Sequence, residues 1–523
     1  MRNFNVTGTC VPKKHYMVDI ASKLEQIKMM IDAEKYFTIN RGRQYGKTTT
    51  LLALELFLRD EYTVIAISFE GLGEKPFSNE ENFCQTFMRL ISKALRFTVE
   101  SKEYGDSWLN PDVKGFESLS EHITDMCEDK KIVLTIDEVD KTSNNVIFLN
   151  FLSKLREKFL ARNAGKDFTF YSVILAGVYD IKNIKLRLIQ EGFHTSVAGE
   201  TTINNSPWNI AADFEVDMSF SAAEIETMLV EYEKDHQTGM NIAEIAEEIY
   251  TYTSGYPVLV SRICKHIDEK FKRQWDIDGV REAVQMMLQE DSPLFQSLIK
   301  NLTSNEDFSN LVYHVIMTDL RVPFNLDDPY VSLGARYGYF KNANNRVAIA
   351  NKIFEVRLTN YFINKELHER IKVTPLWGVD DEGIIVNGKF NMQVCLEKFA
   401  KYYHEYYSDK DVKFIEIHSR YFLLFFISPI LNGHGFAHLE SQTTDRKRRD
   451  VIVNYLDQQF IIELKIWRGE KLHDEAFMQL LGYMDKKYLN EGYLLTFDFR
   501  QNKEQKQEWI EVANGKKIFN IIV

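Results

Sequence analysis

The chain has 523 residues, of which 45% are hydrophobic and 27% charged, and this length and composition predict a folded globular protein of about three domains. Its net charge of −12 excludes a generally basic nucleic-acid-binding surface, so any contact with DNA must come from a local basic cluster. Five scattered cysteines predict reduced thiols. The N-terminus has no apolar core of signal-peptide length, and the longest apolar run, residues 421–431, is far short of a membrane span, so we expect a cytoplasmic protein without a membrane partner.

The first predicted element is a short β-rich run, residues 36–40, which breaks into a turn ending in Gly46-Lys47-Thr48 before a helical pattern. This order of residue types suits a phosphate-binding loop, because a flexible backbone can point its N–H groups at phosphate oxygens. The Lys47 ammonium would reach the β- and γ-phosphates, and the Thr48 hydroxyl would ligate Mg²⁺ at a helix N-terminus. The sequence therefore predicts an ATP site.

One position departs from the usual spacing of such a loop. Arg41 stands where the first glycine is expected, and the nearest glycine is Gly42. This departure leaves open how tightly the first half of the loop wraps the phosphates. Arg41 and Arg43 flank the loop, and contact with phosphate or exposure to solvent are equal alternatives for them.

Further strands are predicted at residues 62–68, 131–137, 171–177 and 214–218. The second of these is apolar almost throughout, as expected for a strand buried on both faces, and it ends in Asp137 and Glu138. Ligands bind at the carboxyl ends of parallel strands, so Asp137 would hold Mg²⁺ directly or through water, and Glu138 would polarise the attacking water. Alternation of strands with helices predicts a parallel α/β sheet. The residues assigned to ATP and its metal are Gly42, Gly46, Lys47, Thr48, Thr49 and Asp137.

With these two motifs the chain resembles the AAA-like ATPases of the additional-strand, catalytic-glutamate class, and within them the signalling-type (STAND) branch. The resemblance implies a P-loop ATPase domain over residues 1–225, with a parallel sheet of strand order 5-1-4-3-2. It also implies a helical arm and a winged helix over residues 226–370. In the arm, residues 253–260 resemble a Gly-x-Pro element, and residues 291–361 resemble the winged helix. We expect the winged helix to pack against protein rather than DNA, because the segment is not notably basic.

The hydrophobic pattern loosens over residues 371–411, which predicts a connector that ends in a helix. A new, small α/β domain is predicted over residues 412–523. Its elements are expected to be an apolar helix at 414–427, strands at 450–455 and 459–465, and a helix at 475–484.

Acidic and basic side chains meet on the two predicted strands of this last domain. Glu463 and Lys465 lie two positions apart on a strand and therefore emerge on the same face. Asp450 opens the preceding strand, where its carboxylate can share that face. Two carboxylates beside a lysine suit a phosphodiesterase that uses Mg²⁺ or Mn²⁺, in which the lysine orients water and offsets charge. A plain cross-strand ion pair is the alternative for Glu463 and Lys465.

This arrangement resembles the PD-(D/E)xK nuclease superfamily over residues 395–523. The resemblance implies that Asp450, Glu463 and Lys465 take its three signature roles, although Arg449 stands where a proline often precedes the aspartate. Gln479, on the predicted helix at 475–484, matches a glutamine that is frequent in the superfamily, and Tyr483 lies one turn further on.

Three further features surround this predicted nuclease motif. The extra acid that some superfamily members carry is Glu416 or Glu440, and the helical position favours Glu416. Residues 446–449 form the densest basic run, for which contact with DNA phosphates or a solvated turn are equal alternatives. His434 and His438 lack the helical spacing of a zinc site, so we expect them to be ordinary surface or core residues.

Together these patterns predict an ATP-binding and ATP-hydrolysing protein that gates a C-terminal, Mg²⁺-dependent nuclease acting on DNA. The resemblance implies a prokaryotic role in defence or DNA maintenance. The alternative is a nucleotide-gated regulatory switch that binds a protein partner, in which the nuclease-like fold is an inactive scaffold. A second copy of the chain is a further expected partner in either case.

Overall fold

The computed structural model describes residues 2–96, 102–139, 145–177, 208–271, 273–317, 321–370, 382–407, 422–424, 426–428, 430–431, 435–439, 450–467, 469–486, 489–500, 506–512 and 515–523. The chain divides into two compact units. The first comprises Met1–Gln237, Gly255–Arg262 and Arg336–Gly338, and the second comprises Thr238–Ser254, Ile263–Ala335 and Tyr339–Val523. The finer division into four domains stays a prediction.

The first unit contains a parallel sheet of four strands in the order β1-β4-β3-β2. This is the expected order for these four strands, whose positions the sequence predicted to within one residue. All six residues of β3 are buried, which explains why that strand is apolar almost throughout. The strands are β1 (Phe37–Asn40), β2 (Thr63–Ser68), β3 (Ile132–Asp137) and β4 (Ser172–Gly177).

The fifth strand, expected at residues 214–218, is not formed. The chain pairs with the edge of the sheet only at Ala212, which makes a parallel bridge to Phe37 and donates its N–H to the Tyr36 carbonyl at 2.8 Å. Beyond that point the Val216 carbonyl accepts a hydrogen bond from the Arg41 guanidinium at 3.1 Å. The segment thus lies beside β1, as the order 5-1-4-3-2 requires. It does not form a strand, because the Arg41 side chain binds the Val216 carbonyl, which would otherwise be available for a hydrogen bond to a neighbouring strand.

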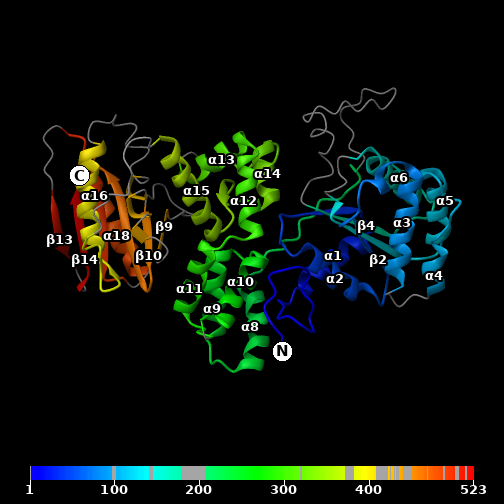
Figure 1. Cartoon of the computed structure of the whole chain (residues 1–523), viewed down its shortest axis with the longest axis horizontal. Coiled ribbons are helices and arrows are strands. Elements are labelled where there is room, and N and C mark those ends of the chain that lie inside the picture. Colours follow the sequence, from blue (N-terminus) through cyan, green and yellow to red (C-terminus); the bar gives the residue numbers. More distant parts are fainter. Residues whose placement is uncertain are drawn as a thin grey trace. The chain divides into compact units, whose positions relative to one another are not determined.

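Helices cover both faces of this sheet (Figure 1). On one face, α1 (Ala21–Asp32) and α2 (Lys47–Leu58) pack against β1 and β4. On the other face, a larger apolar core is built with α3 (Glu80–Leu95), α5 (Phe116–Cys127) and α6 (Val146–Asn163). The short elements η1 (Lys75–Phe77) and α4 (Lys102–Ser107) also belong to this unit.

Helix α8 (Ala222–His236) also belongs to the first unit, and its ends follow from local chemistry. Ser221 and Glu224 form a capping box, in which each side chain accepts from the other residue's backbone N–H. Gln237 closes the helix in the left-handed conformation, with φ of 51°. One stripe of the helix, comprising Ile225, Met228, Leu229 and Tyr232, is buried.

A run of helices follows in the chain, with a small antiparallel ladder between β5 and β6. Three helices, this ladder and a long helix are the elements expected of a winged helix, whose assignment stays a prediction. The elements are α9 (Ile242–Thr253), α10 (Pro257–Glu269), α11 (Ile277–Gln289), α12 (Pro293–Thr303), α13 (Glu306–Met317), α14 (Pro329–Tyr337), β5 (Phe340–Asn342), β6 (Val347–Ile349) and α15 (Lys352–Arg370).

The C-terminal part contains a mixed sheet of six strands in the order β13-β14-β12-β11-β10-β9. Strands β9, β10 and β11 pair antiparallel, whereas β12 is parallel to both β11 and β14. The predicted strands at 450–455 and 459–465 and the predicted helices in the connector and at 475–484 are confirmed. The elements are β7 (Ile385–Val386), β8 (Lys389–Phe390), α16 (Met392–Tyr407), β9 (Gly435–Leu439), β10 (Asp450–Tyr455), β11 (Gln458–Ile466), α18 (Glu470–Lys486), β12 (Glu491–Phe497), β13 (Gln507–Glu511) and β14 (Lys517–Ile522).

Several expected features lie outside the described residues. They include most of the helix expected at 414–427, of which residues 422–424 and 426–427 are helical, and the basic run at 446–449. Among the described residues, no helix is both long and apolar enough to cross a membrane.

Gly255 is the glycine whose replacement is expected to disturb the first unit most. Its φ is +71°, and a Cβ added there would lie 1.8 Å from the Phe220 carbonyl oxygen. Gly255→Ala should therefore lower the free energy of unfolding by about 3 kcal/mol through overpacking and backbone strain. Gly165→Ala is the matched control, because Gly165 has a φ of +68° but nothing within 4 Å of an added Cβ. Urea denaturation of both variants measures the difference, and equal losses would contradict the steric account.

Candidate functional site

The loop between β1 and α2 has the backbone of a phosphate-binding loop. Gln44 and Gly46 both adopt the left-handed conformation, with φ of 57° and 81°, and α2 begins at Lys47. The Lys47 side chain is buried, and its ammonium donates to the carbonyls of Arg41 at 2.9 Å and Gly42 at 3.1 Å. The loop therefore curls around the lysine, with the first turn of a helix directly behind it.

The end of β3 meets the start of α2, as the sequence predicted. The Thr48 hydroxyl donates to the Asp137 carboxylate at 2.5 Å, and Asp137 is almost fully buried. The backbone N–H of Glu138 donates to the other Asp137 oxygen at 2.8 Å. Glu138 itself has a φ of 56°, a conformation that costs about 1–3 kcal/mol for a residue other than glycine and often occurs at functional sites.

The Thr48 hydroxyl and the Asp137 carboxylate lie 2.5 Å apart, and both are hard oxygen ligands of the kind that Mg²⁺ prefers when it is bound together with nucleotide phosphates. Mg²⁺ needs only one or two protein oxygens in such sites, because phosphates and water complete its octahedron. This fits the described residues, among which no group of three or more His, Cys, Asp and Glu side chains could hold a metal by itself.

Residues from two distant segments brace the loop. The Tyr256 hydroxyl donates to the Arg43 carbonyl at 2.6 Å, and its ring lies 4.6 Å from that of Tyr45. A Cβ on Gly42 would lie 2.6 Å from the Tyr337 carbonyl oxygen, so only glycine fits there. Tyr256 belongs to the segment that resembles a Gly-x-Pro element, whereas nothing in the sequence pattern pointed to Tyr337.

The two arginines beside the loop differ in their surroundings. The Arg41 guanidinium donates to the Val216 carbonyl and lies 5.6 Å from the centre of the Phe214 ring. It is thus occupied at the sheet edge, which favours a structural role for Arg41. Arg43 is exposed, and its backbone carbonyl is the group that Tyr256 binds.

Two further contacts connect the loop to its surroundings. Tyr45 and Ser219 share a hydrogen bond of 2.6 Å between their hydroxyls, and burial raises the pKa of Tyr45. The Thr49 hydroxyl accepts the backbone N–H of Cys10 at 3.1 Å, and burial raises the pKa of that cysteine thiol. The predicted role of Thr49 in nucleotide binding did not anticipate this contact with the N-terminal segment.

In the C-terminal sheet the predicted acidic positions are direct neighbours. Asp450 on β10 and Glu463 on β11 are Cα partners in the antiparallel ladder, so the two positions lie on the same face of the sheet. Glu463 is only 1% exposed, and the Lys465 ammonium lies 2.7 Å from its carboxylate. The same ammonium donates to the side-chain oxygen of Gln479 on α18 at 3.3 Å.

Other polar residues on this face were missed by the sequence analysis. Thr496 on β12 is the register partner of Lys465 and is buried. Asp498 follows two residues later, is also buried, and accepts hydrogen bonds from the Arg500 guanidinium at 2.6–3.0 Å. Arg500 in turn lies 4.6 Å from the centre of the Trp467 ring.

The structure does not describe several of the other residues predicted from the sequence. Glu416, Glu440 and His434 lie outside the described residues, as does the basic run at 446–449. Tyr483 is buried in the apolar core between α18 and the sheet.

Comparisons with solved structures find several proteins that share about a tenth of their residues with this chain. A Walker-type ATPase of Pyrococcus abyssi shares 11% identity, with 68% of this chain and 99% of that chain covered and a TM-score of 0.44. The ORC2 protein of Aeropyrum pernix, in ADPNP and ADP complexes, shares 10% identity over 65% and 93%, with a TM-score of 0.32. The RuvB Holliday junction branch migration motor of Thermotoga maritima shares 11% over 65% and 94%, with a TM-score of 0.33.

No curated protein matches the sequence. The model of the AAA-like domain family, in contrast, matches residues 22–362, which is well over half of the chain. This match spans the phosphate-binding loop, the strand that ends in Asp137 and the segment that braces the loop through Tyr256. The chain therefore belongs to the AAA-like domain family.

Proposed function

We propose that the first unit binds and hydrolyses ATP and that this reaction gates a Mg²⁺-dependent nuclease in the C-terminal sheet, which acts on DNA. The observation that supports the ATPase most directly is the 2.5 Å contact between Thr48 and Asp137 beside the buried Lys47. A lysine, a hydroxyl and a carboxylate at the start of one helix and the end of one strand are the groups that hold a nucleoside triphosphate and its metal.

Each residue of this site has a distinct task in the proposed hydrolysis. Lys47 would exchange its hydrogen bonds to two loop carbonyls for phosphate oxygens, and the N–H groups at the start of α2 would point at the same phosphates. Mg²⁺, held by Thr48 and Asp137, would offset the charge that develops on the transferred phosphoryl group. Glu138, next in the chain to Asp137, would accept a proton from the attacking water.

Glu138→Gln should separate binding from hydrolysis. The amide keeps the size of the side chain and lies outside the phosphate-binding loop, so ATP affinity should stay within about twofold while turnover falls at least about 100-fold with the loss of a general base. Titration with a fluorescent ATP analogue and phosphate release measure the two effects. Unchanged turnover would remove Glu138 from the proposed mechanism.

The nuclease proposal is supported by the pairing of Asp450 with Glu463 in the β10–β11 ladder, with Lys465 and Gln479 beside them. Two carboxylates on one face suit Mg²⁺ or Mn²⁺, whose task would be to polarise a phosphodiester. Lys465 would offset charge on the phosphate and orient the attacking water, and Gln479 would hold the lysine in place.

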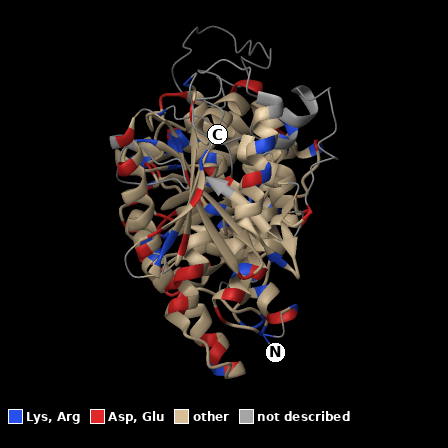
Figure 2. Cartoon of the chain, turned by 90° about the vertical axis from the view of Figure 1, so that its left-hand side faces the viewer, with Lys and Arg blue, Asp and Glu red and all other residues tan. Residues whose placement is uncertain are grey.

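DNA is the proposed substrate of that site. Over the described ribbon, basic and acidic residues are interspersed (Figure 2), so the attraction for phosphates would have to be local. Lys465, Arg500 and the basic run at 446–449 would supply it.

Plasmid cleavage by the purified full-length chain tests the combined proposal. We expect nicking that requires Mg²⁺ or Mn²⁺ and that changes when ATP is added, because a ligand shifts an equilibrium through its different affinity for two states. Cleavage that is indifferent to ATP and to Glu138→Gln would argue against gating. ATP turnover without cleavage of any DNA or RNA substrate would favour the alternative, a nucleotide-gated switch for a protein partner.

A further inference from the structure

The N-terminal residues form a closed loop, residues 3–15, which we call the N-terminal loop. Its two ends are joined by backbone hydrogen bonds of 3.0 Å, from Asn3 N–H to the Lys14 carbonyl and from Tyr16 N–H to the Asn3 carbonyl. Within the loop, the Val11 N–H donates to Nδ1 of His15 at 2.8 Å. These hydrogen bonds close the loop and connect its two ends directly.

The base of the N-terminal loop is anchored on α8 by an aromatic cluster. Phe4, Tyr16 and Tyr232 are at most 2% exposed, and each pair of their rings has centroids 5.1 Å apart. Such contacts between large buried rings contribute packing as well as area burial.

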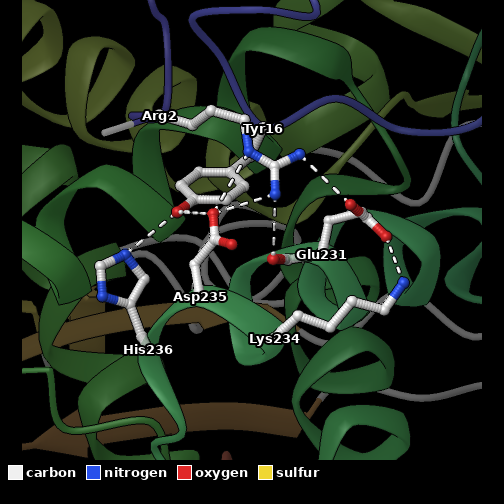
Figure 3. A network of polar contacts seen from close by, with 6 residues as sticks. All are labelled: Arg2, Tyr16, Glu231, Lys234, Asp235 and His236. Atoms are coloured by element: carbon white, nitrogen blue, oxygen red, sulfur yellow. Dashed lines mark hydrogen bonds and ion pairs between the residues drawn. The ribbon is translucent and has the colours of Figure 1, made fainter.

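Polar contacts beside this cluster also connect the N-terminal segment to α8 (Figure 3). The Arg2 guanidinium donates to Asp235 at 2.9 Å and to Glu231 at 3.2 Å. The Tyr16 hydroxyl donates to the same Asp235 carboxylate at 2.9 Å and lies 3.0 Å from Nε2 of His236. Hydrogen bonds from Arg2 lower the pKa of Asp235, and that carboxylate in turn raises the pKa of Arg2.

The contacts with α8 repeat along one face of the helix. Glu224 binds the Lys23 ammonium at 2.7 Å, and the Thr227 hydroxyl accepts the Asp19 N–H at 2.9 Å. Glu231 and Asp235, which bind Arg2, follow at spacings of four residues, so all four positions share one face. Residues 2–23 thus hold α8 over nearly its whole length.

The other side of the N-terminal loop touches α2. The backbone N–H of Cys10 donates to the Thr49 hydroxyl at 3.1 Å, one residue after the Thr48 that binds Asp137. A rearrangement of Thr48 and Thr49 around a nucleotide and its metal would therefore act on Cys10, and through the closed loop on the anchor at Arg2.

We propose that the N-terminal loop is a positioning element that transmits the nucleotide state of α2 to α8. The loop contacts α2 through the hydrogen bond from Cys10 to Thr49, and Arg2 and Tyr16, which flank the loop, anchor it on α8. This role rests on the proposed nucleotide binding. The coupling must work in both directions. If nucleotide binding stabilises the contacts of the loop with α8, then a variant that weakens those contacts must weaken nucleotide binding by the same factor.

Hydrogen exchange of the nucleotide-free protein tests the mechanical link by itself. Arg2→Gln should speed exchange of the Cys10 amide about fivefold, the effect of losing roughly one net hydrogen bond, although Cys10 lies eight residues away. Arg96→Gln is the matched control, because Arg96, at the end of α3, pairs with Asp106 on α4 at 2.7 Å, in a different part of the unit from Cys10 and α8. Equal Cys10 exchange in wild type and Arg2→Gln would overturn the link whatever the protein does with nucleotides.

ADP titration tests the transmission. ADP should slow amide exchange in α8 of wild type, and both Arg2→Gln and Asp235→Asn should weaken ADP binding about fivefold. Thr49→Val, which removes the acceptor for Cys10, should abolish the ADP effect on α8 at saturating ADP, and Thr49→Ser should restore it. ADP binding with no change at α8 would overturn this role alone, whereas no ADP binding by wild type would overturn the proposed ATPase with it.

Discussion

Lys47→Ala should weaken ATP and ADP binding on the order of 100-fold, the loss expected when charge-assisted hydrogen bonds to phosphate disappear. The structure makes this residue hard to replace. Its ammonium is buried within the loop, where it donates to the carbonyls of two adjacent residues, Arg41 and Gly42. Calorimetric titration of both nucleotides measures the effect.

Two further variants make the result specific. Lys47→Arg keeps the charge but is too bulky for the curl of the loop, so its affinity should fall nearly as far. Lys154→Ala removes a lysine of α6 from its ion pairs with Glu117 on α5 and Glu157 on α6, and it should leave affinity unchanged. Equal nucleotide affinity for wild type and Lys47→Ala would remove the loop from the proposed function.

The parts of the fold that sequence reasoning predicted well are those with a strong local signal. Strand β3 reads as a continuous apolar run because all six residues are buried, and its end is marked by two acidic residues. The alternation of β10 and β11 likewise predicted that Asp450 could share a face with Glu463, and the register confirms that they are partners. In both cases a pattern of a few adjacent residues determines the geometry.

The prediction of a fifth strand was wrong because of a long-range contact, which a local sequence pattern cannot reveal. Residues 214–218 alternate between apolar and acidic side chains, which is a good strand pattern. A guanidinium from Arg41, more than 170 residues away in the chain, takes the Val216 carbonyl instead. The braces of the phosphate-binding loop at Tyr256 and Tyr337, and the contact of Cys10 with Thr49, are likewise long-range contacts without a local signal.

The C-terminal site offers the sharpest chemical test. Glu463→Gln and Asp450→Asn should each reduce Mg²⁺- or Mn²⁺-dependent cleavage at least about 1,000-fold, because a metal that stabilises the transition state by several kcal/mol would lose a charged ligand. Both replacements keep the size of the side chain. The buried Glu463 position therefore stays filled, and the fold should survive.

Lys465→Ala separates the rate of the chemical step from the affinity for the metal, because an ammonium group does not ligate a cation. Removing it should leave Mn²⁺ affinity the same or higher, since it relieves the 2.7 Å competition for the Glu463 carboxylate, while the cleavage rate falls about 100-fold. Asp457→Asn is the matched control, an exposed carboxylate at the turn between the same two strands, and its activity should equal that of wild type. If Lys465→Ala cut DNA as fast as wild type, the Glu463–Lys465 pair would be a structural ion pair, and the C-terminal sheet would fit the scaffold of a nucleotide-gated switch better than a nuclease.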